Sequence, residues 1–165
     1  MMRPAPDPVL PGQESVWAYP RPAIAQGFAG RIEIVHRGFT LADARHAVRT
    51  LETSHPPSYY LPRAAIAMQK LTPSPKRSLC EWKGHAIYFH VEIDGVFLAD
   101  AAWSYPEPTS AFEPLRDHIA FYAGPFDACL VDGERVTPQA GAFYGGWITA
   151  KVAGPFKGAP GSAFW

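Results

Sequence analysis

The sequence predicts a mainly β protein, built from twisted antiparallel sheets with a few short helices. Proline accounts for 18 of the 165 residues, against an average usage of about 5%, and each proline inside a helix costs ~3 kcal/mol. The chain is also rich in aromatic residues, with 10 Phe, 7 Tyr and 5 Trp, which favour strands. Two Asp-Gly dipeptides, at 94–95 and 132–133, separate apolar segments in the way that β-hairpins require. An all-helical fold is therefore the least favoured by the sequence.

The first half of the chain contains one clear hairpin. Residues 31–36 alternate apolar and polar side chains, and Arg37-Gly38 provides a turn into residues 39–41. Residues 43–53 fit one face of a helix and also alternate as a strand, so both interpretations stay open. Residues 53–63 contain three prolines and must be extended or turn.

The second half predicts further hairpins. Residues 64–71 hold a short helical turn and then a strand, and residues 115–122 a short helix or 3-10 turn that leads into a strand. The strands 85–93 and 96–103 flank Asp94-Gly95, and 126–131 and 134–136 flank Asp132-Gly133. We therefore expect a Pro-rich arm at 1–12, a single β-rich domain at 13–152 and a Gly/Pro-rich tail at 153–165.

Charge and hydropathy exclude several classes of partner. The 15 basic and 15 acidic residues cancel, so nothing favours nucleic acid or an anionic membrane. No apolar run approaches the ~18 residues of a membrane-spanning helix. Prolines interrupt the start of the chain where a signal peptide needs a continuous apolar stretch. We expect a cytoplasmic protein, and the sequence does not predict its oligomeric state.

The cysteines and histidines do not predict a metal site. Cys80 and Cys129 are the two cysteines, too few for a four-cysteine zinc site or a disulfide framework. His85 and His90 are separated by an odd number of residues, so on one strand they face opposite sides. We expect neither a metal nor a cofactor.

The densest group of reactive residue types is Cys80, Lys83 and His85. A cation beside a thiol favours the thiolate, and Lys or His can serve as an acid or a base. The candidate catalytic residues are accordingly Cys80, Lys83 and, from the Pro-rich segment, His55. The alternative is that Cys80 is a packed structural residue and that Lys83-Gly84 is a simple turn.

Proline stiffens the segment that holds Tyr59, Tyr60 and Arg63, which lowers the entropic cost of positioning them. In an extended chain Tyr59 and Tyr60 point to opposite faces, so one packs inward while the other lines a groove. The guanidinium group of Arg63 can bind a carboxylate or phosphate through two parallel hydrogen bonds. The alternative is that Arg63 pairs with an internal acid such as Glu52.

The pattern Trp-x-Tyr-Pro-charge-Pro occurs at 17–22 and again at 103–108. In an extended segment its Trp and Tyr share one face, and the proline ends the strand. The two copies are either convergent strand ends or two walls of one groove. Trp103 and Tyr105, together with Trp82, form either an aromatic cage for a planar ligand or part of the core.

Six motifs carry a family resemblance: WAYPRP (17–22), LETSHPPSYYLPR (51–63), LTPS (71–74), CEWKGHA (80–86), AAWSYPEP (101–108) and IAFY (119–122). From about Glu14 to Val136 the chain resembles the bacterial domain of unknown function 427 family, also labelled nucleotidyltransferase-like. The resemblance implies a fold of the Mss4-like or β-tent group, in which sheets meet at an angle around a groove. The Cys-x-x-Cys pairs that hold zinc in better-known β-tent proteins are missing here, so we expect no zinc knuckles. The nucleotidyltransferase label lacks support, since we find neither Gly-Ser followed by paired Asp nor a Gly-rich phosphate loop.

Two functions remain as hypotheses. The first is a groove that binds a small anionic or planar metabolite through Arg21, Tyr60, Arg63, Lys83, Trp103 and Tyr105. The second is a small enzyme that uses Cys80 or a Tyr/Lys/His set. A protein–protein contact through the Pro-rich arm and the tail is a third possibility.

Overall fold

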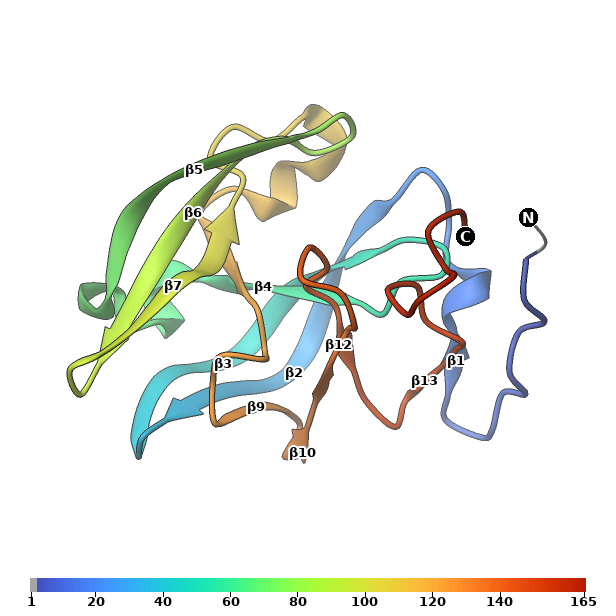
Figure 1. The fold of residues 1–165 in the computed structure, drawn as a ribbon, viewed down its shortest axis with the longest axis horizontal. Helices are drawn as coiled ribbons and strands as arrows, with labels where there is room; N and C mark the ends of the chain where they lie inside the picture. Colours follow the sequence, from blue (N-terminus) through green and yellow to red (C-terminus); the bar gives the residue numbers. More distant parts are fainter. Residues whose placement is uncertain (1–2) are drawn as a thin grey trace.

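The computed structural model describes residues 3–165 and confirms the mainly β class. Its main sheet is nine-stranded, with the order β10-β9-β2-β3-β4-β8-β7-β6-β5, and all its strand pairs are antiparallel. Figure 1 shows that β5, β6 and β7 stand at an angle to the long β2–β3 hairpin.

The strands are β1 (Glu14–Ser15), β2 (Ile24–His36), β3 (Phe39–Leu51), β4 (Ser58–Pro62), β5 (Leu71–Cys80), β6 (Gly84–Ile93), β7 (Val96–Ser104), β8 (His118–Phe121), β9 (Ala128–Val131), β10 (Glu134–Arg135), β11 (Thr137–Pro138), β12 (Trp147–Ile148) and β13 (Val152–Ala153). The short 3-10 helices are η1 (Val16–Ala18), η2 (Arg63–Ala65), η3 (Met68–Lys70) and η4 (Ser110–Leu115).

Three predicted turns are confirmed by their backbone angles. Arg37-Gly38, Asp94-Gly95 and Asp132-Gly133 each join two antiparallel strands, and both residues of each pair have positive φ. Two consecutive positive φ angles define the type I′ turn, whose twist matches that of the flanking strands. A glycine at the second position takes this conformation without steric cost.

The first hairpin is longer than its sequence pattern predicts. β2 begins at Ile24 rather than near Arg31, and the ambiguous segment after Asp43 continues β3 to Leu51. Register shifts after Ala29 and after Ile34 break the simple alternation of β2. Each bulge moves the later side chains to the other face. A search for strict alternation of apolar and polar residues therefore underestimates the length of the strand.

The larger core lies on one face of the main sheet. Its fully buried members include Ile34, Leu61, Ile119, Phe121 and Trp147. Trp147 is 1% exposed and its Nε1 donates a hydrogen bond to the Phe121 carbonyl at 2.9 Å. The Trp147 ring is thus sealed inside the protein, with its polar ring atom satisfied there.

The N- and C-terminal segments pack against each other. Strand β1 pairs in parallel with β13, and the Asp7 backbone N–H donates to the Gly154 carbonyl at 2.8 Å. The Trp17 and Trp165 rings lie 5.7 Å apart, and Figure 1 shows both ends of the chain on one side. The predicted arm, of which residues 1–2 lie outside the described residues, is thus laid against the predicted tail.

Within residues 3–165, no helix has the length and apolar character that crossing a membrane requires. Over the same range, we find no group of three or more His, Cys, Asp and Glu side chains placed to hold a metal ion.

Candidate functional site

A transverse row of side chains crosses the face of the sheet opposite the larger core. Tyr60 on β4 is the register partner of Ala120 on β8, Ala120 of Trp103 on β7, and Trp103 of Tyr88 on β6. The small Ala120 side chain leaves room above it, so the large rings on either side approach each other. The ring centroids of Tyr60 and Trp103 lie 6.0 Å apart at 84°, an edge-to-face arrangement.

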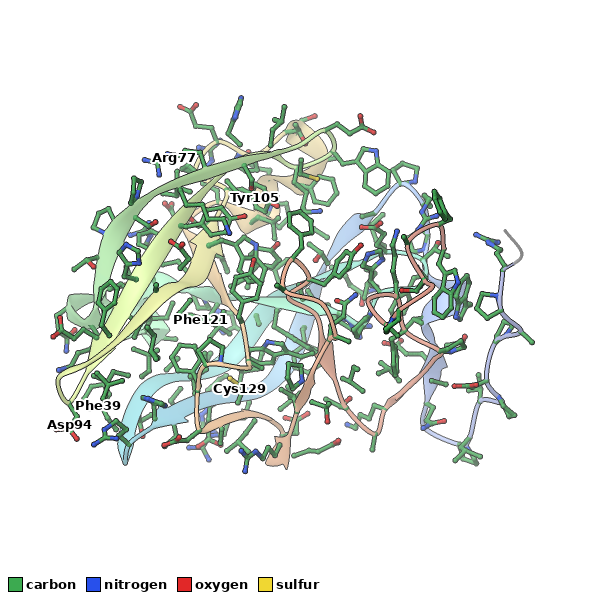
Figure 2. The ribbon with its side chains drawn as sticks, viewed as in Figure 1. Phe39, Arg77, Asp94, Tyr105, Phe121 and Cys129 are labelled. Atoms are coloured by element: carbon green, nitrogen blue, oxygen red, sulfur yellow. The ribbon has the colours of Figure 1, made fainter. Side chains whose placement is uncertain are left out.

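The aromatic row extends along the chain as well as across it. Tyr105, two residues after Trp103, lies 6.3 Å from Tyr60, and Tyr122, two residues after Ala120, lies 4.6 Å from Trp103. This is the alternation predicted for the second Trp-x-Tyr-Pro copy. In Figure 2, Phe121 lies between β7 and the β2–β3 hairpin, whereas Tyr105 lies beyond the end of β7.

These rings form the wall of a cleft of about 370 Å³, which we call the aromatic cleft. Its volume lies within the range typical of small-molecule sites. It is lined by Thr50, Glu52, His55, Pro56, Ser58, Tyr60, Leu79, Cys80, Lys83, Tyr88, Trp103, Tyr105, Tyr122, Gln139, Phe143, Tyr144, Gly145 and Lys157.

The hydroxyls of Tyr60, Tyr105 and Tyr122 stay protonated at neutral pH. Burial raises the pKa of Tyr60 and of Tyr105 well above the ordinary value and that of Tyr122 to about 12. The Tyr60 hydroxyl accepts a hydrogen bond from Trp103 Nε1 at 3.2 Å, and the Tyr88 hydroxyl lies 2.8 Å from Ser78 Oγ. A neutral phenol can donate a hydrogen bond to an anion or a carbonyl.

Lys83 supplies a positive charge at the aromatic wall. Its Nζ lies 5.9 Å from the centre of the Tyr105 ring and 5.7 Å from that of Phe112. None of the ion pairs within residues 3–165 involves Lys83. Lys157 also lines the cleft, and its Nζ donates to the Trp165 carbonyl oxygen at 3.2 Å.

Arg21 contacts the cleft only indirectly, through the residues beside it. It is not among the lining residues, but its guanidinium lies 3.8 Å from the carboxylate of Glu52, which does line the cleft. Arg21 also donates to the Thr53 carbonyl at 3.0 Å. The acid at this edge of the cleft is therefore already paired with a cation.

Arg63 lies away from the cleft. Its guanidinium sits 5.9 Å from the centre of the Phe89 ring, and Phe89 belongs to the larger core on the opposite face. Strand β4 ends at Pro62 and Arg63 begins η2, so the alternation of the strand no longer decides where this side chain points. The expected meeting of Arg63 with the other cationic and aromatic residues is thus not observed, and Glu52 pairs with Arg21 instead.

His55 and Cys80 both line the aromatic cleft. His55 Nδ1 lies 3.0 Å from the Thr53 carbonyl, which accepts only, so Nδ1 carries the proton and Nε2 is the free nitrogen of the neutral ring. Burial lowers the pKa of His55, against the opposing effect of Glu52. Among the described residues, no hydrogen bond joins Cys80 to His55 or to Lys83, and a nucleophile and its base need such contact.

The first Trp-x-Tyr-Pro copy lies elsewhere. Trp17 is on η1, where its Nε1 donates to the Pro155 carbonyl at 2.9 Å. The Tyr19 hydroxyl donates to Glu14 at 2.7 Å, and both rings belong to a separate small cluster. The two copies therefore do not line one groove.

Sequence reasoning missed several lining residues, of which Tyr88, Tyr122, Tyr144 and Lys157 are the most informative. Tyr88 and Tyr122 carry a usable signal, because each is two residues from an alanine, Ala86 or Ala120, that is buried on the same face. Tyr144 and Lys157 reach the cleft from the segment after β11, and no local pattern predicts that path.

Fold and site together define a mainly β protein whose antiparallel sheet carries the larger core on one face and an aromatic cleft on the other. A family model described as Domain of unknown function (DUF427) matches residues 24–132, and the chain belongs to this family. The matched span includes most of the cleft's aromatic wall and excludes the segment with Tyr144 and Lys157. The search of curated proteins found no match.

Proposed function

We propose that this protein binds a small, planar, anionic metabolite in the aromatic cleft. The observation that carries the proposal is the position of Lys83, a cation without an ion-pair partner among residues 3–165 that lines the cleft and lies over the Tyr105 ring of its wall. Recognition then combines stacking or edge contacts with charge.

A planar ligand fits the walls of the cleft. Tyr60, Trp103, Tyr105 and Tyr122 lie within 4.6 to 6.3 Å of a neighbouring ring, so they brace one another in fixed orientations. Trp103 is 7% exposed and serves mainly as a rigid support, whereas Tyr122 is partly exposed. Rigid aromatic walls contribute apolar contact at a small entropic cost.

An anion fits the charges of the cleft. Glu52 is paired with Arg21, His55 is kept neutral by burial, and Lys83 and Lys157 supply positive charge. Neutral tyrosine hydroxyls add hydrogen-bond donors without adding a charge that must be desolvated.

The alternative is a small enzyme that uses Cys80 or a Tyr/Lys/His set. The gathering of Cys80, Lys83 and His55 around one cleft favours it. The missing contact between Cys80 and a base favours binding. We therefore place binding first.

The cellular location, the source and the class of partner of the protein are proposed on the same basis. Cys80 and Cys129 are free thiols, which fits a reducing cytoplasm, and the family resemblance favours a bacterial source. The zero net charge favours a small-molecule partner over nucleic acid.

Calorimetric titration with 2-naphthoate tests the proposal, because this probe is a planar ring system with one carboxylate. We expect saturable binding at one site, weakened about tenfold by Lys83→Met, which removes the charge and keeps the length of the side chain. The matched control is Lys70→Met, since Lys70 Nζ also lies over a ring, 5.0 Å from that of Phe39, outside the cleft. Equal affinity in all three proteins, or no binding in any, would contradict the proposal.

A further inference from the structure

A short loop divides the region above Tyr122 into two chambers. This loop, residues 139–146, is called the strap. It closes on itself, because the Gln139 N–H donates to the Gly146 carbonyl at 2.9 Å and the Gly146 N–H donates to Gln139 Oε1 at 3.1 Å. Gln139 Nε2 also donates to the Lys157 carbonyl at 2.8 Å, so the strap is anchored at its base.

The strap lies directly on the aromatic wall. A Cβ added at Gly145 would lie 2.2 Å from the Trp103 ring, and one at Gly146 would lie 2.5 Å from the Pro56 carbonyl. Only glycine permits such close approach of the backbone. The ring centroids of Tyr144, in the strap, and His55 lie 5.5 Å apart. Phe143, at the tip of the strap, is 73% exposed.

On the other side of the strap lies a second cavity of about 450 Å³. It shares Tyr122, Gln139, Tyr144 and Gly145 with the aromatic cleft. The two chambers thus have a common floor in Tyr122 and a common partition in the strap. One ligand that passes over Tyr122 would reach both.

The second chamber carries an available cation. Lys76 lines it, and its Nζ lies 4.5 Å from the centre of the Tyr88 ring, which itself lines the aromatic cleft. Within residues 3–165, no ion pair includes Lys76. The acid of this chamber, Asp100, accepts a hydrogen bond from Ser74 Oγ at 2.5 Å, and its backbone N–H donates to His90 Nδ1 at 3.0 Å; the anionic group of the ligand would therefore lie toward Lys76 and away from this carboxylate.

We infer that the second chamber is a subsite for a second anionic group, and that the ligand is a planar molecule with acidic groups at opposite ends. The inference rests on the proposed function, in which Lys83 receives the first group. Lys76 and Cys80 are four residues apart on β5, ~13 Å at ~3.3 Å per residue, and Lys83 follows Cys80 in the turn. A ligand that contacts both lysines therefore needs acidic groups that are well separated, as they are in a two-ring dianion.

The test compares 2,6-naphthalenedicarboxylate with 2-naphthoate by calorimetric titration of the full chain. In the wild-type protein we expect the dicarboxylate to bind about tenfold more tightly, because a second charged contact forms. Lys76→Met should abolish that advantage and leave the affinity for 2-naphthoate unchanged. Lys83→Met should weaken both probes, and the control Lys70→Met should change neither.

The outcomes separate the two proposals. Tight binding of both probes with no preference for the dicarboxylate, or a preference that survives Lys76→Met, would overturn the second subsite and leave the aromatic cleft in place. Binding of neither probe would overturn both. Lys76 is exposed and Lys70 and Lys83 are partly exposed, and a circular-dichroism spectrum of each variant establishes that the substitution leaves the fold intact.

Discussion

Tyr59 and Tyr60 are neighbours in the chain, yet they belong to two different regions of the molecule. Tyr59 packs 5.5 Å from Trp147 and 5.2 Å from Phe28 on the core side of the sheet. Tyr60 points to the other face and joins Trp103 in the wall of the aromatic cleft. Strand alternation alone therefore assigns one ring to the larger core and the next to the wall of the aromatic cleft.

The two faces differ in what covers them rather than in residue type. Each contains a tryptophan whose Nε1 is hydrogen-bonded, Trp147 to the Phe121 carbonyl and Trp103 to the Tyr60 hydroxyl. The cleft face is covered only in part, by the strap and η4, which leaves Lys83, His55 and Tyr122 partly exposed. Aromatic packing thus fills the larger core on one face and, under the proposed function, forms a prearranged binding surface on the other.

The largest effect is expected from Trp147→Ala, which should lower the free energy of unfolding by ~3–5 kcal/mol because it leaves a cavity in the closed core. Trp82→Ala is the comparison on the cleft face, where the ring is only partly buried, and its cost should be clearly smaller. Urea denaturation measures both. Equal losses would show that the two faces are not distinct.

Gly145→Ala should lower the free energy of unfolding by ~1–3 kcal/mol, because the added methyl group overlaps the Trp103 ring and the strap must shift. It should also weaken 2-naphthoate binding. Gly124→Ala is the matched control, since nothing lies within 4 Å of the added Cβ and φ is ordinary there. A neutral Gly145→Ala would mean that the strap does not press on the cleft wall.

Tyr60→Phe should cost ~1–2 kcal/mol, because the buried Trp103 Nε1 loses its acceptor while the ring volume is nearly unchanged. Thermal unfolding followed by circular dichroism gives the difference. If the variant is as stable as the wild type, the hydrogen bond between the two rings does not hold the wall together.

The smallest effect concerns pH and His55. Burial lowers its pKa in the folded state below the ordinary 6.5, so below that pH the unfolded chain takes up a proton that the folded chain resists. The stability contributed by the neutral ring is therefore present above pH 6.5 and lost as the pH falls toward the folded pKa. Urea midpoints between pH 7 and 5 should fall less in His55→Gln than in the wild type.

The exposed His46 provides the control, because His46→Gln should follow the wild-type pH profile. A His55→Gln profile that matches the wild type would place this ring in solvent rather than in the wall of the cleft.

The sequence predicts the hairpins well because their information is local. Asp94-Gly95 and Asp132-Gly133 encode the turn in two residues, and the face shared by Trp103 and Tyr105 follows from strand alternation. The strand that ends at Leu51 stays ambiguous in the sequence, because its apolar residues fit both the helical period of about 3.6 residues and the strand period of two.

The site is predicted less completely because it depends on contacts that are distant in the chain. The cleft wall forms only when β8 places the small Ala120 between the large rings of Tyr60 and Trp103, and Lys83 comes to this wall from a separate turn. The position of Arg63 is not predicted by the stiffness of the Pro-rich segment, because the chain leaves β4 and enters η2 at this residue. Lys157 reaches the cleft through the path of the last segment, which no pattern near it predicts.

The most direct test of the binding surface is a nitrogen–proton spectrum that resolves the indole signals of the five tryptophans during titration with 2-naphthoate. The Trp103 Nε1–H signal should shift saturably, because its ring lines the cleft and bonds Tyr60. The Trp147 signal should stay unchanged, because that ring is sealed on the other face. Shifts at Trp147 or Trp17 without one at Trp103, or no shift at all, would contradict the division of the sheet into a core face and a binding face.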